Sequence, residues 1–402
     1  MNRRDFLART AAVAAADQTF AETAPETAPY QIGAYYFPNF HVDPRNEKVH
    51  GAGWTEWELL KRAEPRFPGH AQPKKPLWGY EDESDPNVFA RKIDAAADHG
   101  LTHFLFDWYW FNDGPFLERG LEKGYLQAGN HSRLNFALMW ANHDWVDIQP
   151  AKRNMKPLLL YPGAISEATF ERMTDYVIER YFRHPSYWKI EGCPYFCVYQ
   201  TFLLVEGLGG AAKTKAALER FRRKTRAAGF PGLHLNAIAF GIRILPGEQA
   251  LQDPRGMLSY LGFDSVSAYV WIHHSKMPSF PETEYADVAA DAARQWREAA
   301  GRYGLPYQPN VTMGWDPSPR CCQSDRFENA GYPFTPTLKN NTPTAFRTAL
   351  RAVKEHLNAL PARNRILSIN AWNEWTEGSY LEPDTVHGMA YLEAIRDVFG
   401  RR

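Results

Sequence analysis

Residues 85–110 read DPNVFARKIDAAADHGLTHFLFDWYW and contain one complete helix–strand unit. Asp85 followed by Pro86 is typical of a helix start, because the aspartate can cap the first turn and proline fits the first helical position. The pattern predicts a helix that runs to about His99, before Gly100. The apolar run 102–108 is continuous rather than alternating, which favours a parallel strand covered on both faces.

The same alternation recurs along the chain. Amphipathic stretches that predict further helices cover 166–182, 211–228, 285–303 and 344–359. The predicted strands are 32–37, 102–108, 135–140, 195–199, 234–240, 265–270, 308–313 and 366–371. The sequence contains no GxGxxG or GxxxxGK[ST] phosphate loop. The alternation therefore favours an α/β fold of the (β/α)8 TIM-barrel type over a doubly wound sheet.

The N-terminal segment differs in character from the rest. Arg3-Arg4, followed by an Ala-rich stretch, resembles a twin-arginine export signal, and residues 17–29 are typical of a linker. The signal predicts a protein of the periplasm or of the cell exterior. Because Arg9 interrupts the short apolar region, the alternative is a signal that is not functional and a protein that stays in the cytoplasm. We expect one catalytic domain over 30–402, with an unusually long first strand–helix connection, 38–84, before any helix begins.

Composition narrows the function classes. The chain has 46 basic and 46 acidic residues, so it offers no basic field for nucleic acid or an anionic membrane. No apolar run is long enough to predict a membrane span. Its 13 Trp, 20 Tyr and 24 Phe suit either a large aromatic core or a sugar-binding cleft. Four cysteines without paired metal-ligand spacing predict no metal, and we predict no cofactor.

Aromatic and hydrogen-bonding residues recur where the predicted strands end, which is the active face of such barrels. His273 and His274 are adjacent, so their side chains diverge on a strand and a hydrogen-bonding role is favoured over a metal site. The predicted substrate contacts are Tyr36, Trp54, Glu56, Asp107, Trp108, Tyr109, Trp140, Asn142, Tyr199, Tyr269, Trp271, His273, Trp315, Asp316, Arg320, Trp372, Asn373 and Trp375.

Two glutamates follow the last predicted strand in WNEWTEG, residues 372–378. Glycoside cleavage needs one protonated carboxyl group to assist the leaving oxygen and one ionised group. Trp372 and Trp375 would raise one pKa by desolvation. Glu374 and Glu377 are therefore the predicted catalytic pair; the alternative is a solvated loop with two surface glutamates.

Several motifs together carry a family resemblance that extends over about residues 31–395. They are AYYFPNFH (34–41), GWTEW (53–57), RFPGHAQP (66–73), DWYWFN (107–112), WANHDW (140–145), GWDPSPR (314–320) and INAWNEWTEGSYLEP (369–383). In these motifs the chain resembles the glycoside hydrolase family 99-like group, also called WbsX-like.

The resemblance implies a (β/α)8 barrel that acts on an oligo- or polysaccharide. The better-studied family 99 enzymes are retaining endo-α-mannosidases with a Glu-x-x-Glu pair, which would make Glu374 the base and Glu377 the general acid/base. The base would deprotonate the sugar's 2-hydroxyl and give a 1,2-anhydro intermediate, so 1,2-trans sugars such as α-mannosides and α-L-rhamnosides are the expected substrates. Asn373 and Thr376 stand where that motif has His, and His143-Asp144 replaces a common Glu-Asn. The resemblance therefore does not determine which sugar is bound.

Two other functions are weighed against hydrolysis. WbsX-like proteins are linked to surface-polysaccharide (O-antigen) loci, which suggests a glycosyltransferase, although the sequence has no clear DxD or sugar-nucleotide site. A non-catalytic carbohydrate-binding barrel would keep the aromatic cleft but would not need the carboxylates, and both are present.

Overall fold

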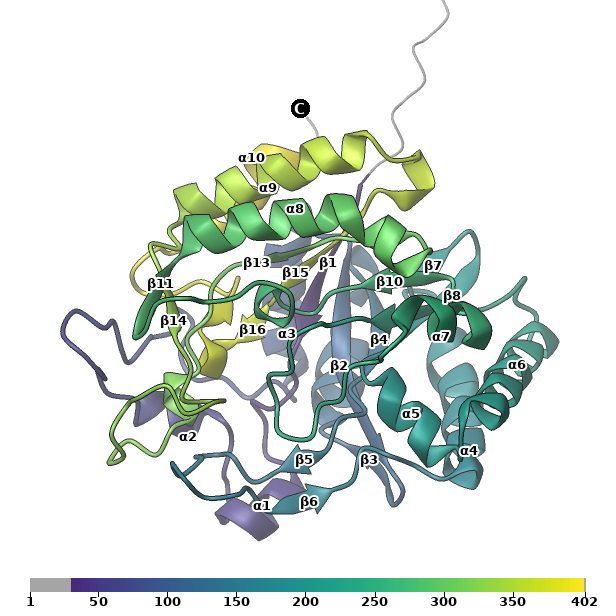
Figure 1. Cartoon of the computed structure of the whole chain (residues 1–402), viewed down its shortest axis with the longest axis horizontal. Helices are drawn as coiled ribbons and strands as arrows, with labels where there is room; N and C mark the ends of the chain where they lie inside the picture. Colours follow the sequence, from purple (N-terminus) through teal and green to yellow (C-terminus); the bar gives the residue numbers. More distant parts are fainter. Residues whose placement is uncertain (1–29, 401–402) are drawn as a thin grey trace, which may run out of the picture.

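Parallel strands form the centre of the molecule. The computed structural model describes residues 30–400, and in it nine parallel strands pair in the order β12-β10-β9-β8-β4-β2-β1-β15-β13 (Figure 1). Most strand residues are buried, including all of β2, as expected for strands covered on both faces. The strands are β1 Gln31–Tyr36, β2 His103–Phe111, β4 Asn135–Trp140, β8 Cys193–Val198, β9 His234–Ile238, β10 Ser265–Ser267, β12 Tyr307–Gln308, β13 Asn310–Thr312 and β15 Ile366–Asn370.

The seventh predicted strand, 308–313, is interrupted rather than continuous. Its first piece, β12, pairs with β10, and its second piece, β13, pairs with β15. Pro309 separates the pieces because proline has no N–H for the ladder, but its carbonyl accepts from the backbone N–H of Ser368 at 3.0 Å. Since β12 and β13 are halves of one strand, the ring closes and the predicted (β/α)8 barrel is confirmed.

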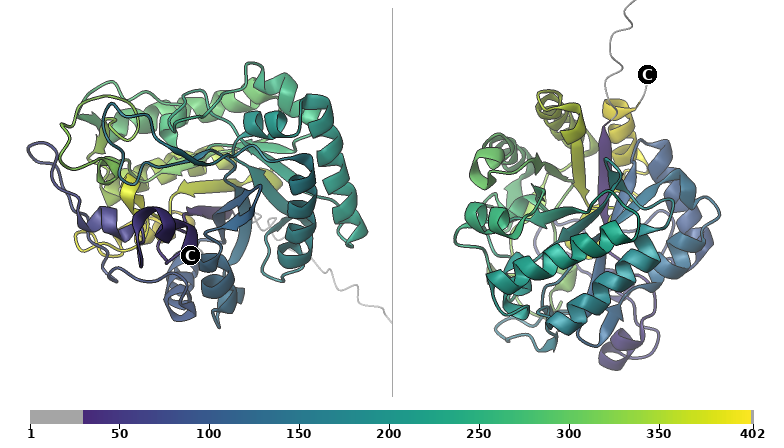
Figure 2. Two further views of the ribbon diagram at one scale, coloured as in Figure 1. Left: turned by 90° about the horizontal axis from the view of Figure 1, so that it is seen from below. Right: turned by 90° about the vertical axis from the view of Figure 1, so that its right-hand side faces the viewer.

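Helices surround these strands, as the two views of Figure 2 show. α3 begins as predicted, because the Asp85 side chain accepts from the backbone N–H of Asn87 at 2.8 Å and Pro86 is its first residue. The other four predicted helices are present as α4 with its π-helical extension Ile178–Phe182, α6, α8 and α9; α5, α7 and α10 were not predicted. The bounds are α3 Pro86–Asp98, α4 Glu167–Val177, α5 Thr201–Gly207, α6 Ala211–Ala227, α7 Pro254–Leu261, α8 Tyr285–Tyr303, α9 Pro343–Asn358 and α10 Ala390–Phe399.

The long connections gather at the end of the barrel where the strands terminate. In Figure 1, α1 Pro44–His50, β3 Gly114–Phe116, β5 Trp145–Val146 and β6 Leu159–Tyr161 lie together at this end. The expectation that 38–84 contains no helix is wrong, since this segment forms α1 and also α2 Trp57–Lys61. Asp43-Pro44 carries the same cap-and-proline signal as Asp85-Pro86, which could have located α1.

The proposed export signal and linker, residues 1–29, lie outside the described residues. Within 30–400, no helix has both the length and the apolar character that a membrane crossing requires.

Candidate active site

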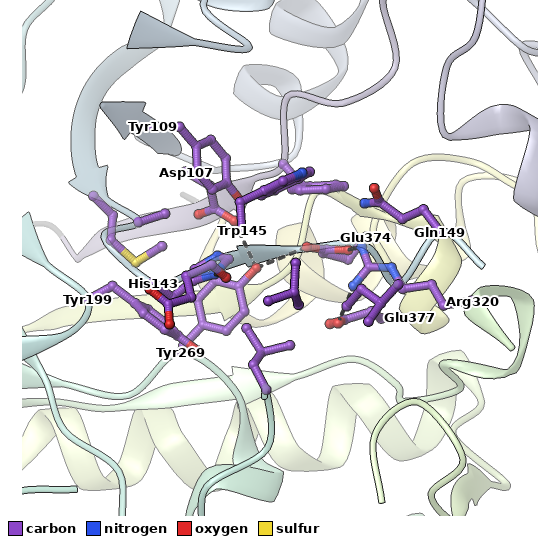
Figure 3. Close-up of a pocket in the computed structure, with 17 residues that line it drawn as sticks. Asp107, Tyr109, His143, Trp145, Gln149, Tyr199, Tyr269, Arg320, Glu374 and Glu377 are labelled. Carbon is purple, nitrogen blue, oxygen red and sulfur yellow. Dashed lines mark hydrogen bonds and ion pairs between the residues drawn. The ribbon is translucent and has the colours of Figure 1, made fainter. Parts of the chain in front are cut away.

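A pocket opens at the carboxyl end of the barrel and contains both predicted catalytic glutamates (Figure 3). Its empty volume is about 580 Å³, counting the part open to solvent. Residues from widely separated strand ends and loops line it: Phe37, Asp107, Tyr109, Met139, Ala141, His143, Asp144, Trp145, Val146, Ile148, Gln149, Tyr199, Leu245, Tyr269, Arg320, Glu374 and Glu377. A cavity of this size and lining suits a small-molecule or sugar ligand.

The catalytic candidates lie on a short hairpin that follows β15. Glu374 ends β16 (Asn373–Glu374), and Glu377 ends a single 3-10 turn, Trp375–Glu377. Their exposed fractions are 3% and 4%, yet both line the pocket. Arg320 joins them, since its Nη2 donates to Glu374 Oε2 at 3.1 Å and its Nη1 donates to Glu377 Oε1 at 2.5 Å. The two carboxylates therefore share one cation.

A third carboxylate, Glu56, holds the same guanidinium from the first connection. Arg320 Nε donates to Glu56 Oε1 at 2.9 Å. Glu56 is fully buried and also accepts from Asn39 Nδ2 at 2.6 Å and from the hydroxyl of Thr376. Through Arg320, the first connection and the loop after β15 are fixed to each other, and the guanidinium is engaged by three carboxylates and by the hydroxyl of Tyr332.

Burial and charge act on the acidity of this pair. Burial, and then the charge of Glu377, raise the pKa of Glu374 well above its usual range, and Arg320 only partly opposes them. Burial also raises the pKa of Glu377, against the opposing effects of Arg320 and of the Tyr332 hydroxyl, which donates to Glu377 Oε1 at 2.7 Å. Since two buried negative charges repel, one cation favours a state in which one carboxyl keeps its proton.

Tyr269 links the pair to a further acid. Its hydroxyl lies 2.8 Å from Asp107 Oδ2 and 3.1 Å from Glu374 Oε1 (Figure 3). Asp107 comes from β2, and burial raises its pKa well above the usual range of an aspartate. All three residues line the pocket.

A buried network lies behind the loop that carries Glu374 and Glu377. Glu382 accepts from the indole N–H of Trp372 at 2.8 Å and from that of Trp375 at 2.6 Å. Lys92 Nζ lies 2.5 Å from Glu382 Oε1 and 2.6 Å from Glu83 Oε1. The two tryptophans that flank Glu374 are thus anchored from the side away from the pocket.

Several predicted contacts lie in the pocket wall and the others do not. Asp107, Tyr109, Tyr199, Tyr269 and Arg320 line the pocket beside the two glutamates. The predicted contacts absent from its lining are Tyr36, Trp54, Glu56, Trp108, Trp140, Asn142, Trp271, His273, Trp315, Asp316, Trp372, Asn373 and Trp375.

Those residues outside the wall have identifiable partners. Tyr36 stacks on Phe89 of α3 at 5.0 Å. Trp54 stacks on His50 at 4.2 Å, Trp108 stacks on Trp110, and Trp140 packs on Phe170 of α4.

Polar members of the same group connect loops to one another. Asn142 exchanges hydrogen bonds with the backbone of Gln200, and Asn373 does so with the backbone of Phe37. Asp316 accepts from Gln72 at 2.6 Å and contacts His70 at 2.9 Å.

The remaining indoles bond the protein's own groups. The N–H of Trp271 donates to the carbonyl of Asn310, and that of Trp315 donates to Thr335. His273 lies 3.5 Å from Glu248.

The structure adds residues that were not predicted as contacts. His143, Trp145 and Gln149 line the pocket from the segment after β4. Tyr199 donates to the buried Glu248 at 2.6 Å, and Glu248 also accepts from the backbone N–H of Leu245, a lining residue. WANHDW was noted for its departure from the family, and that signal could have identified His143; nothing in the sequence around Glu248 indicates its role.

Among residues 30–400 no group of three or more His, Cys, Asp or Glu side chains has an arrangement that could hold a metal ion.

Sequence comparison identifies a family. The family model described as glycosyltransferase WbsX matches residues 32–395. Two relatives, each an uncharacterized protein WxcX from a strain of Xanthomonas campestris pv. campestris, are 31% identical over 390 residues, which is 94% of this chain. The chain spans about half the length of these curated relatives, since the match covers 50% of each.

Structure comparison agrees on the fold. The GH99 endo-alpha-mannosidase from Bacteroides thetaiotaomicron superimposes with a TM-score of 0.56 at 14% identity, covering 92% of this chain and 96% of that one. A glycoside hydrolase-like protein gives a TM-score of 0.60 at 15% identity, covering 93% and 95%. At these identities the likeness establishes a shared barrel architecture.

Proposed function

Since the chain belongs to the family described as glycosyltransferase WbsX and has a fold like that of family 99 glycoside hydrolases, we propose that it hydrolyses glycosidic bonds in an oligo- or polysaccharide. One observation carries the proposal: Glu374 and Glu377 line the same pocket and contact the same guanidinium. Burial opposes two adjacent negative charges while one cation stabilises one of them, which favours the mixed protonation state that glycoside cleavage requires.

The roles follow the family resemblance. Glu374 takes the proton of the sugar's 2-hydroxyl, the 2-oxygen bonds to C1, and the bond from C1 to the leaving oxygen breaks as Glu377 protonates that oxygen. Water then attacks C1 and gives a proton to Glu377, the bond between C1 and the 2-oxygen breaks, and Glu374 returns its proton to the 2-oxygen. Both glutamates regain their starting states, and the two displacements at C1 leave its configuration retained.

This route restricts the sugar. The 2-oxygen must reach C1 from the face opposite the leaving group, so α-mannoside-like and α-rhamnoside-like linkages are the proposed substrates. Aromatic walls support a sugar in the pocket, since Tyr109, Trp145 and Tyr199 line it and such rings pack on the C–H faces of sugars.

A glycosyltransferase is the second candidate, favoured by the description of the family. A sugar nucleotide would bring a diphosphate, which proteins hold with cations or helix N-termini. Arg320 is the one lysine or arginine among the described residues that line the pocket, and three glutamates engage it. The pocket therefore suits a neutral glycan better than a nucleotide donor.

The test is turnover by paired variants. We expect Glu374→Gln and Glu377→Gln each to lower hydrolysis by about 100-fold or more, because general acid–base groups contribute on that scale. Their melting temperatures should stay near that of the parent, and Glu64→Gln, at an exposed position, is the control that keeps activity. Substrates are α-mannans, rhamnans and bacterial exopolysaccharides, assayed by the release of reducing ends, with proton NMR to determine the anomer first formed.

Each alternative outcome has its own meaning. If both glutamine variants keep most of the activity, the catalytic assignment is wrong. Transfer from a nucleotide sugar to an acceptor, without hydrolysis, would favour the transferase, and glycan binding without turnover would favour a non-catalytic barrel.

A further inference from the structure

The hydroxyl of Tyr269 contacts two carboxyl groups but has one hydrogen. It lies 2.8 Å from Asp107 Oδ2 and 3.1 Å from Glu374 Oε1, and Figure 3 marks both contacts. The phenol can donate to only one of these oxygens at a time. The other contact is a hydrogen bond only if that carboxyl brings its own proton and donates it to the phenolic oxygen. Both contacts are therefore hydrogen bonds only if one of the two carboxyl groups, that of Asp107 or that of Glu374, is protonated.

The surroundings of the two ends differ. Glu374 Oε2 accepts from Arg320 at 3.1 Å, so a negative charge on Glu374 has a cationic partner. Tyr269 is the one hydrogen-bond partner of the Asp107 side chain among the described residues, and Oδ1 of Asp107 is buried without a partner. An unpaired buried charge is far more costly than a buried neutral carboxyl group. The contacts favour the charge on Glu374 and the proton on Asp107.

The other titratable groups around Asp107 do not reverse this choice. Burial raises the pKa of each phenol and thiol that faces it, so these groups stay neutral near pH 7. Glu377 adds a like charge when it is ionised, and Arg320, the cation that acts on Asp107, is held by the three glutamates. The groups are Tyr35 from β1, Tyr109 from β2, Cys197 from β8, Tyr199, Tyr269, Arg320, Glu374 and Glu377.

We propose that Asp107 carries the proton in the resting enzyme and, through the phenol of Tyr269, keeps Glu374 ionised as the base. Asp107 donates to the phenolic oxygen, and the phenol donates to Glu374. This inference rests on the proposed function and deepens it: Asp107 and Tyr269 are positioning residues that set the protonation state of the catalytic base. Without this donor, a carboxylate so deeply buried and so close to Glu377 would keep its own proton and could not accept one from the sugar.

The first experiment locates the proton without any substrate. In full-length protein labelled with carbon-13 at the aspartate carboxyl carbon, Asp107→Asn identifies the Asp107 signal by its loss. We expect the parent signal to report a protonated carboxyl at pH 7. An ionised Asp107 at pH 7 would overturn the proposal. If Asp107→Asn does not fold, Tyr269→Phe identifies the same signal, because the carboxyl nearest the removed hydroxyl changes most.

The second experiment measures kcat/KM as a function of pH. Its acidic limb is the range in which kcat/KM rises as the catalytic base loses its proton. Tyr269→Phe removes the donor to Glu374, so the limb should move to higher pH by about one unit, since a hydrogen bond to a charged group has roughly this effect. A purely structural role would lower kcat/KM at every pH without moving the limb. Asp107→Asn can still donate to the phenolic oxygen, so it should leave the limb in place and lower kcat/KM by no more than about tenfold, less than Glu374→Gln.

The two experiments separate the inference from the function. If Asp107→Asn costs as much as Glu374→Gln or moves the limb, Asp107 works as a charged group and the inference is wrong. Absence of turnover in the parent protein would contradict the proposed function, while the carbon-13 signal would still decide where the proton lies.

Discussion

Glu382 is the residue that fixes the loop of Glu374 and Glu377 from behind. It accepts from both indoles that flank Glu374, Trp372 and Trp375, and it pairs with Lys92. A side chain that bonds a loop on both sides of one residue limits the directions in which that residue can point. Glu374, the proposed base, is thus oriented by groups that do not line the pocket.

Lys92 gives a prediction for stability. Lys92→Met would leave Glu83 and Glu382 buried without their cation, so we expect a loss of about 3–5 kcal/mol in the free energy of unfolding, measured with urea. The matched control is Lys61→Met, because Lys61 pairs with Glu58 at 2.9 Å on the surface. That change should cost less than about 1 kcal/mol. Similar losses in both variants would contradict a special role for the buried network.

The sequence located the acids of the pocket better than its rings. Position directly after the last strand was enough to find Glu374 and Glu377, and Asp107 followed from the end of the second strand. Neighbouring residues on a strand point to opposite faces, so Asp107 faces the pocket while Trp108 packs outward on Trp110. Composition gives the number of aromatic residues but not the direction in which each ring points. For this reason many of the predicted tryptophans lie outside the pocket wall.

At the scale of elements, the tight turn of the hairpin that carries Glu374 and Glu377 packs against Asp316 in the loop after β13. Gly378 has a φ of +65°, and a Cβ placed on it would lie 2.6 Å from Cβ of Asp316. Asp316 cannot easily yield, since Gln72 and His70 hold its carboxylate. The turn after Glu377 therefore has room only for glycine.

Gly378→Ala tests that contact. The new methyl group should push the hairpin away from Asp316 and lower kcat/KM by about tenfold or more, since small displacements of catalytic groups are costly. The control is Gly79→Ala: its φ is +86°, but nothing lies within 4 Å of a Cβ there. Both variants bear the strain of an alanine at positive φ, so equal activities would show that crowding at Asp316 does not matter.

Elements with a clear period were predictable and irregular ones were not. The helical repeat found α3, α4, α6, α8 and α9. α5 and α7 have 7 and 8 residues, which is too short for a repeat to stand out. Apolar residues at 391, 392, 395 and 398 carry the helical spacing of α10, and this signal could have found it. The loop that carries Glu248 has no period, because its shape depends on hydrogen bonds to Tyr199 and to its own backbone.

At the scale of the whole molecule, stability should fall as pH rises above 6.5. Burial raises the pKa of Glu83 to about 7 and that of Asp107 well above its usual range. In the unfolded chain these groups lose their protons near pH 4. The folded state then holds more protons, so each step up in pH lowers the free energy of unfolding.

Buried histidines act in the opposite sense but over a lower range. Burial lowers the pKa of His41 to about 4 and that of His103 to about 3, so they favour the folded state as pH rises only up to their unfolded value of about 6.5. Thermal unfolding followed by circular dichroism from pH 6.5 to 8 should show a falling midpoint, with a smaller slope in Asp107→Asn. A rising midpoint would contradict this balance.

The excess of carboxyl groups around one guanidinium also indicates what kind of molecule would block the pocket. Asp107, Asp144, Glu374 and Glu377 line it, and Arg320 is the one lysine or arginine among the described residues that do so. A sugar being cleaved gains positive charge near its ring oxygen, and this acidic wall suits that charge. An imino sugar with a protonated ring nitrogen carries the same charge permanently and should compete with substrate. Glycans that bear sulfate, phosphate or uronic acid groups would be repelled at the entrance.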